Sequence, residues 1–177
     1  DSVYASDAAE ALATVLRALA EPGDPGLFRA ALATPLLGYD AAAIAALEDD
    51  TQAFDRAADA FERAAQLWRG RGPLPALLPF VTTAAKRWLG ERGGARLLTD
   101  TLHLLELLQA DAPLHLGPTE QLRWFAQMRA RPGDDDRAQL RLESDADLIR
   151  ISTVHKAKGL EYGVVVLPYL AMKRSEP

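Results

Sequence analysis

Residues 97–108 read Leu-Leu-Thr-Asp-Thr-Leu-His-Leu-Leu-Glu-Leu-Leu, and this stretch decides how the rest of the chain is organised. Its leucines, wound at helical spacing, surround most of a helix instead of forming a stripe along one side. A helix that is apolar around most of its circumference needs neighbours on several sides. The stretch therefore predicts a helix at the centre of a helical bundle.

The segments before this stretch predict the outer helices of the bundle. The first begins at about Asp7, because Asp7 and Glu10 have capping-box spacing, and it ends before Pro22. Asp24-Pro25 combines an N-cap with proline at the first helical position and predicts a second helix that ends near Thr34-Pro35. The first helix has one core-facing stripe with i, i+3, i+4, i+7 spacing, made of Leu12, Val15, Leu16 and Leu19.

Further capping residues and chain breaks divide the remaining helical sequence. Asp40 predicts the cap of a short helix that runs to about Leu47, and an apolar stripe from Phe54 to Trp68 ends at a glycine- and proline-containing break. The other predicted helices cover 75–89 and the residues from Pro118 onward.

Composition agrees with a mainly helical globular protein. The chain has 177 residues, 49% of them hydrophobic, and a formal net charge of -5. Its length fits roughly one domain of ~150 residues, and no apolar run of ~18 residues could span a membrane. Because cysteine is absent, disulfides, thiolate metal sites and cysteine nucleophiles are excluded. Since the first residue is aspartate and not methionine, we expect the chain to be a piece of a longer protein.

The charge is unevenly distributed along the chain. Residues up to Gln139 contain 14 Lys and Arg against 20 Asp and Glu, whereas residues from Leu140 contain 6 against 5. The first part therefore has a net charge of -6 and the second part +1. The predicted helical body is acidic, and the remainder is slightly basic.

The apolar pattern changes period after an exposed loop predicted at Arg131–Asp136. Two β-branched runs, at 148–154 and 164–167, have the length of strands, and the second is typical of a strand covered on both faces. Two strands cannot form a stable sheet alone, so Val3 and Tyr4 are predicted to supply a third. The helical body would then be an insertion between strands of an α/β domain.

The loop between these two runs carries the candidate chemistry. It reads Ser-Thr-Val-His-Lys-Ala-Lys-Gly-Leu-Glu from Ser152 to Glu161. Hydroxyl, imidazole and ammonium groups bind phosphate oxygens, and Gly159 permits close backbone approach. The loop is a candidate phosphate contact for a nucleotide or a nucleic acid. The alternative interpretation is a solvated connection whose lysines face water.

Part of this loop also resembles a known motif. Thr153-x-His155-x-x-Lys158-Gly159-Leu160-Glu161-Tyr162, followed by a valine run, resembles motif V of superfamily 1A DNA helicases, the UvrD, Rep and PcrA group. The longer stretch that begins at Arg141 resembles the RecB family of helicase-nucleases. The matching region of that family is the helical domain 2B, inserted in the RecA-like domain 2A.

The resemblance implies a mainly α fold, with a helical bundle attached to a partial RecA-like α/β domain that has short parallel strands at both termini. Residues 1–5 would be a strand of domain 2A, residues 6–137 domain 2B, and residues 138–177 the returning part of domain 2A with motif V. It implies that Thr153, His155 and Lys158 contact DNA and that Gly159 and Glu161 lie on the nucleotide side.

For the whole protein, the resemblance implies ATP and Mg²⁺ as cofactors, single-stranded and duplex-end DNA as ligands, RecC-like and RecD-like subunits as partners, and a cytoplasmic location without a membrane association. The chain contains no Gly-x-x-x-x-Gly-Lys-Ser/Thr loop, no arginine-rich motif VI and no nuclease carboxylate cluster. We therefore expect the chain alone to have no catalytic residue, to bind no cofactor and to be inactive.

Two alternatives remain open at this point. The chain could come from a UvrD-like or AddA-like helicase, or the helical body could be a protein-interaction module that docks a RecC-like subunit. The acidity of the body favours docking over direct duplex binding, because DNA phosphates attract basic surfaces.

Two further groups of residues have plain structural interpretations. The basic residues of segment 69–96 lie beside Trp68 and Trp88, a combination that can bind nucleic acid through stacking. The acidity of the body instead favours tryptophans anchored in the core under a solvated basic face. His103 and His115 have no partner of metal-binding type nearby, so no metal site is predicted.

Overall fold

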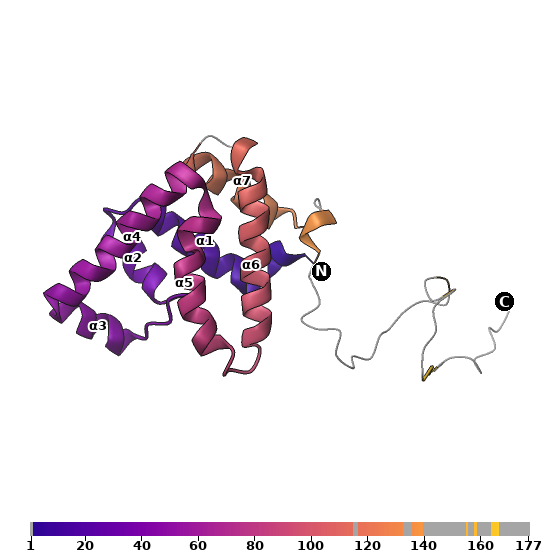
Figure 1. Ribbon diagram of the computed structural model, residues 1–177, viewed down its shortest axis with the longest axis horizontal. Helices are drawn as coiled ribbons and strands as arrows, with labels where there is room; N and C mark the ends of the chain where they lie inside the picture. Colours follow the sequence, from indigo (N-terminus) through magenta and orange to yellow (C-terminus); the bar gives the residue numbers. More distant parts are fainter. Residues whose placement is uncertain are drawn as a thin grey trace, which may run out of the picture. The chain divides into compact units, whose positions relative to one another are not determined.

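The computed structural model describes residues 2–114, 117–132 and 136–139, together with 155, 158 and 164–166. The chain divides into two compact units, Asp1–Glu143 and Ser144–Pro177. The larger unit is helical throughout its described part (Figure 1). Its α-helices are α1 (Asp7–Ala20), α2 (Pro25–Leu32), α3 (Ala41–Asp49), α4 (Thr51–Arg71), α5 (Pro73–Trp88), α6 (Gly94–Asp111) and α7 (Pro118–Ala130), and its short 3-10 helices are η1 (Val3–Ala5), η2 (Ala112–Leu114) and η3 (Asp136–Ala138).

Side-chain caps fix the N-termini of the first four α-helices. Asp24 Oδ1 accepts from the backbone N–H of Gly26 at 2.7 Å, and Asp40 Oδ1 accepts from that of Ala43 at 2.7 Å. Both caps are confirmed as predicted. The cap of α1 differs from the prediction, because Ser6 accepts from Ala9 N at 3.3 Å and Asp7 is the first helical residue. Asp50, which caps α4, was not predicted.

The turn between α4 and α5 is closed by a side chain from α6. Gly72 has φ +94°, a conformation that glycine adopts without strain. The Gln109 side chain donates to the Arg71 carbonyl at 3.2 Å and accepts from Leu74 N at 3.2 Å. The Arg71 carbonyl and the Leu74 N–H are thereby hydrogen-bonded, and α6 is linked to the turn that joins α4 and α5.

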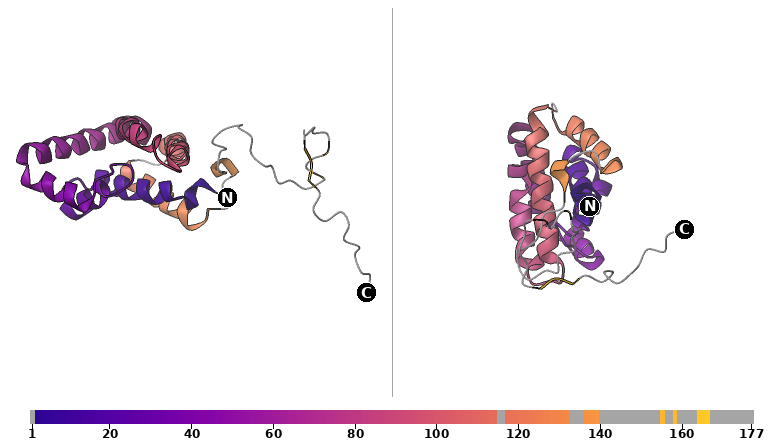
Figure 2. Two further views of the ribbon diagram at one scale, coloured as in Figure 1. Left: turned by 90° about the horizontal axis from the view of Figure 1, so that it is seen from below. Right: turned by 90° about the vertical axis from the view of Figure 1, so that its right-hand side faces the viewer.

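The helices of the larger unit form two layers. Figure 2 shows α4, α5 and α6 together on one side and α1, α2 and α7 on the other. Within the first layer α5 lies between α4 and α6, and α1 packs against α2, α4, α6 and α7. The amphipathic stripe of α1 therefore faces the first layer, as its spacing predicted.

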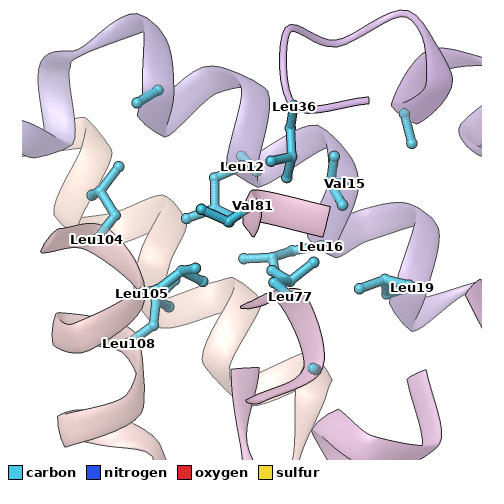
Figure 3. Packing of buried hydrophobic residues seen from close by; sticks show 14 of the residues in the cluster. Leu12, Val15, Leu16, Leu19, Leu36, Leu77, Val81, Leu104, Leu105 and Leu108 are labelled. Carbon is cyan, nitrogen blue, oxygen red and sulfur yellow. The ribbon is translucent and has the colours of Figure 1, made fainter. Parts of the chain in front are cut away.

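The core fills the space between the layers. Leu16 of α1, Leu77 of α5 and Leu105 of α6 point toward one another and are at most 1% exposed (Figure 3). The prediction that this helix is the centre of the bundle is wrong, because α5 lies between α4 and α6 and α6 is at the edge of the first layer (Figure 1). Its leucines Leu104, Leu105, Leu107 and Leu108 are nevertheless buried. Leu97, Leu98 and Leu102 are only partly buried, so one side of α6 lies nearer the surface than predicted.

The prediction of a strand at Val3 and Tyr4 is wrong, because Val3–Ala5 forms the 3-10 helix η1. The reason is local. The Ser2 hydroxyl accepts from Tyr4 N at 3.3 Å, and the Ser6 hydroxyl donates to the Val3 carbonyl at 2.7 Å. These two hydrogen bonds stabilise a turn in place of an extended strand. Ser2 itself forms an isolated antiparallel bridge with Gln139, not a parallel pairing.

The second predicted run of strand residues also differs from the prediction where it is described. Val164, Val165 and Val166 are not in a strand and are 62–85% exposed. A buried strand takes its burial and its hydrogen bonds from neighbouring strands, and no strand lies beside these valines in the described part of the chain. The first run, at 148–154, lies outside the described residues.

Candidate functional site

The loop that resembles motif V, from Ser152 to Glu161, belongs to the smaller unit, Ser144–Pro177, which we call the motif V segment after that resemblance. Two of its predicted site residues are described, His155 and Lys158, and both are exposed. An imidazole and an ammonium group that are open to solvent can reach an external phosphate, which is the contact predicted for them. Thr153, Gly159 and Glu161 lie outside the described residues, so the loop's predicted DNA and nucleotide groups stay predictions.

The basic segment of the larger unit has its tryptophans in the core, as the structural interpretation predicted. Trp68 and Trp88 are each 2% exposed. The Trp68 indole N–H donates to Gln121 Oε1 at 2.7 Å, and that of Trp88 donates to the Pro35 carbonyl at 3.2 Å. Their ring faces are covered, so neither tryptophan is placed to stack on a nucleic-acid base.

The basic side chains of the same segment divide into engaged and exposed groups. Arg87 donates to the Pro35 carbonyl, and Arg96 pairs with the buried carboxylate of Asp100 at 2.9 Å. Arg69, Arg71, Lys86 and Arg92 are exposed. The first two lie at the end of α4 and the last two lie at and after the end of α5, so a whole helix separates the pairs. The segment does not form one continuous basic surface.

The start and the end of the described helical chain meet at one place, which we call the neck: Ser2–Ala5 and Asp136–Gln139, with His103 and Asp111 of α6. Ser2 bridges to Gln139. His103, only 2% exposed, lies with Nε2 2.9 Å from the Arg137 carbonyl. Because a carbonyl only accepts, Nε2 carries the proton and donates. Sequence reasoning examined His103 only as a metal ligand and missed this contact.

An ion pair and apolar burial complete the neck. Asp111 Oδ2 lies 3.2 Å from Nη2 of Arg137, and the carboxylate is largely buried whereas the guanidinium is half-exposed. Val3 and Ala138 are 0% exposed. Tyr4 packs edge-on against Trp124 and Phe125 of α7, with ring centroids 6.1 Å apart in each pair. The aspartate and the histidine come from one helix, so α6 holds the end of the chain segment while α7 covers its start.

Other surface features offer no convergent chemistry. The depression lined by Arg63, Gln66, Leu67, Gly70 and Arg71 is formed by α4 alone. Within residues 2–114, 117–132, 136–139 and the isolated described positions, no group of three His, Cys, Asp or Glu side chains could hold a metal ion. In the same part of the chain, no helix has the combined length and apolarity needed to cross a bilayer.

Comparison with known proteins gives the relation of the chain. No protein-family model matches it. The RecBCD enzyme subunit RecB of Escherichia coli is 37% identical over 173 residues, which cover 96% of this chain and 15% of that protein. The subunit of the same name from Haemophilus influenzae is 37% identical over 179 residues, which cover 100% of this chain and 15% of the relative. The chain is homologous to a segment of RecB.

The RecB match extends across both units, so the acidic helical body is as much part of the homology as motif V. By contrast, an ATP-dependent helicase/nuclease subunit of Leuconostoc mesenteroides is 39% identical over only 54 residues, which cover 30% of this chain and 4% of that protein. The chain spans about 15% of the length of the RecB relatives. The resemblance predicted from the residues is therefore confirmed as homology to a RecB segment.

Proposed function

We propose that this chain is the 2B-type helical insertion and the motif V segment of a RecB-like subunit, within an ATP-dependent DNA helicase-nuclease that acts on duplex ends in double-strand break repair and recombination. One observation carries the proposal, the RecB match along 96–100% of the chain. Residues 1–5 and 138–177 are assigned to a RecA-like domain 2A, and the helical residues between them to domain 2B.

Within this proposal, the motif V residues have separate tasks. Thr153, His155 and Lys158 contact the backbone of one DNA strand, and Gly159 and Glu161 face the nucleotide. In the whole protein, bound ATP would supply the free energy of stepping, and Mg²⁺ would neutralise its phosphates. The exposure of His155 and Lys158 supports the DNA-side assignment. RecC-like and RecD-like subunits are the proposed partners.

The test uses the full-length RecB-like protein that contains this chain. His155→Ala removes one phosphate contact, worth about 1.5–3 kcal/mol if charge-assisted. We expect the single-stranded DNA concentration for half-maximal ATPase stimulation to rise roughly ten- to hundredfold. Lys156→Ala is the matched control, since that position lies outside the predicted contacts and should change it less than about twofold. Equal values for wild type and His155→Ala would contradict the DNA-side role of the loop.

The competing UvrD-like or AddA-like assignment receives less support, because the helicase/nuclease protein of Leuconostoc mesenteroides matches a much smaller part of the chain than RecB does.

Docking of a RecC-like subunit is a compatible second function. It is favoured by a group of exposed carboxylates on α3 and α4 that includes Asp49, Asp55 and Asp59. These carboxylates repel DNA phosphates and suit a basic protein surface. The triple variant Asp49→Lys, Asp55→Lys, Asp59→Lys should lower co-purification of the RecC-like subunit with the full-length protein. Unchanged co-purification would show that these carboxylates are not the docking surface.

A further inference from the structure

His103 is an unusual residue for the place it occupies. It lies among the buried leucines of α6, where its neighbours in sequence Leu104 and Leu105 are fully buried. Its Nδ1 is buried and has no hydrogen-bond partner in the described part of the chain, which costs free energy that a leucine would avoid. Among the described residues, its side chain makes one hydrogen bond, and this goes to the backbone of the neck at the Arg137 carbonyl.

Asp111 holds the same residue of the neck from a second point. His103 and Asp111 are eight residues apart on α6, about 12 Å along the helix axis. His103 binds the main chain of Arg137, and Asp111 binds its side chain. Two contacts to different parts of one residue fix both its position and its direction.

The neck could open only at the expense of buried surface. Val3 and Ala138, which flank the Ser2–Gln139 bridge, are both 0% exposed. Withdrawal of Asp136–Gln139 would break the bridge to Ser2, leave the buried Asp111 carboxylate without Arg137, and break the His103 hydrogen bond. Each loss is unfavourable, and they would occur together.

From these contacts, we propose that His103 is a positioning residue that keeps the neck closed. The start of the chain at Ser2–Ala5 and the segment Asp136–Gln139 then stay together. This inference goes beyond the proposed function and does not depend on it, because every contact it uses lies inside the larger unit.

The first test is hydrogen exchange of the 177-residue chain, read by mass spectrometry on a peptide that contains Arg137–Gln139. His103→Leu keeps the apolar pattern and removes the donor, so exchange in this peptide should become at least about tenfold faster. Thr101→Val is the matched control, because Thr101 is equally buried on α6 but bonds only to the Leu97 carbonyl of its own helix. It should change neck exchange less than about twofold.

Two results would overturn the proposal: unchanged neck exchange in His103→Leu, or an equal increase in both variants. If His103→Leu unfolds the whole chain, exchange will rise in every helix, and His103→Gln decides the question. Its side-chain amide can still donate to the Arg137 carbonyl, so slow neck exchange supports the proposal and a tenfold increase contradicts it.

A cross-link gives an independent test, because the chain contains no cysteine of its own. Partners in an antiparallel bridge have Cα atoms about 4.5–5.5 Å apart, which suits a disulfide. Ser2→Cys with Gln139→Cys should oxidise to an intramolecular disulfide, and in the His103→Leu background this disulfide should return neck exchange to within about twofold of wild type. Failure to form the disulfide, or failure of that rescue, would show that His103 does not act by closing the neck.

Discussion

Two valines in different units show how differently the two parts of the chain are stabilised. Val15 of α1 is 0% exposed, and Val165 of the motif V segment is 62% exposed. A helix satisfies most of its backbone hydrogen bonds internally, so the seven α-helices described in the larger unit can bury a core among themselves. A β-branched run needs neighbouring strands for both burial and hydrogen bonding. The helical unit thus contains its own source of stability, and the motif V segment contains candidate chemistry.

The strongest way to break this contrast is to create a cavity in the helical core. Leu105→Ala removes a side chain that is 0% exposed at the meeting point of α1, α5 and α6. It should lower the free energy of unfolding by about 2–5 kcal/mol, measured by urea denaturation followed by circular dichroism. Leu89→Ala, at a position 67% exposed, is the control and should change it by less than about 0.5 kcal/mol. Similar losses in both variants would mean that the core lies elsewhere.

A smaller effect is expected from a buried polar contact between the layers. Trp68→Phe removes the indole donor and leaves Gln121 Oε1 without it, in a residue that is 5% exposed. The free energy of unfolding should fall by about 1–3 kcal/mol. Adding Gln121→Leu should recover part of this loss, because the oxygen that lost its donor is then removed as well. Additive losses in the double variant would argue against the hydrogen bond.

Removal of a helix cap should cost less again. Asp40→Ala deletes the acceptor for Ala43 N at the start of α3, at a cost of about 1 kcal/mol. Asp40→Asn retains an acceptor and should stay within about 0.5 kcal/mol of wild type. A thermal-unfolding comparison of the two variants separates the cap from the loss of charge, and equal melting temperatures would exclude the cap as a source of stability.

The smallest effect on stability should come from the motif V segment itself. His155 is exposed and lies outside the helical unit, so His155→Ala should change the free energy of unfolding of the 177-residue chain by less than about 0.5 kcal/mol. The same urea titration measures it. A loss of more than about 1 kcal/mol would show that the two units share stability.

Local signals explain why most helices could be predicted from the sequence. Asp24-Pro25 and Asp40 mark helix starts, and the glycine- and proline-containing break after Trp68 separates α4 from α5 within a residue or two of its position in the structure. These signals act over two to four residues. The prediction of a strand at Val3–Tyr4 is wrong for a similarly local reason, because Ser2 and Ser6 cap a 3-10 turn there.

Contacts distant in sequence could not be predicted in the same way. His103 binds a carbonyl 34 residues away, and Trp68 binds a glutamine 53 residues away. Composition gives no information about such pairs, because only the packing of α6 with η3, and of α4 with α7, brings them together. The motif V residues differ from both groups, because a resemblance to known helicases predicts them. The described part of the chain adds only the exposure of His155 and Lys158.

The placement of the tryptophans has a spectroscopic consequence. All three, Trp68, Trp88 and Trp124, lie in the helical unit, and the first two are almost fully buried. Intrinsic tryptophan fluorescence of the chain therefore comes from that unit, and Trp68 and Trp88 contribute the blue-shifted emission of shielded indoles. A ligand that binds the motif V segment alone would leave the signal unchanged, whereas one that disturbs the bundle would shift it to the red, so one optical measurement separates the two kinds of event.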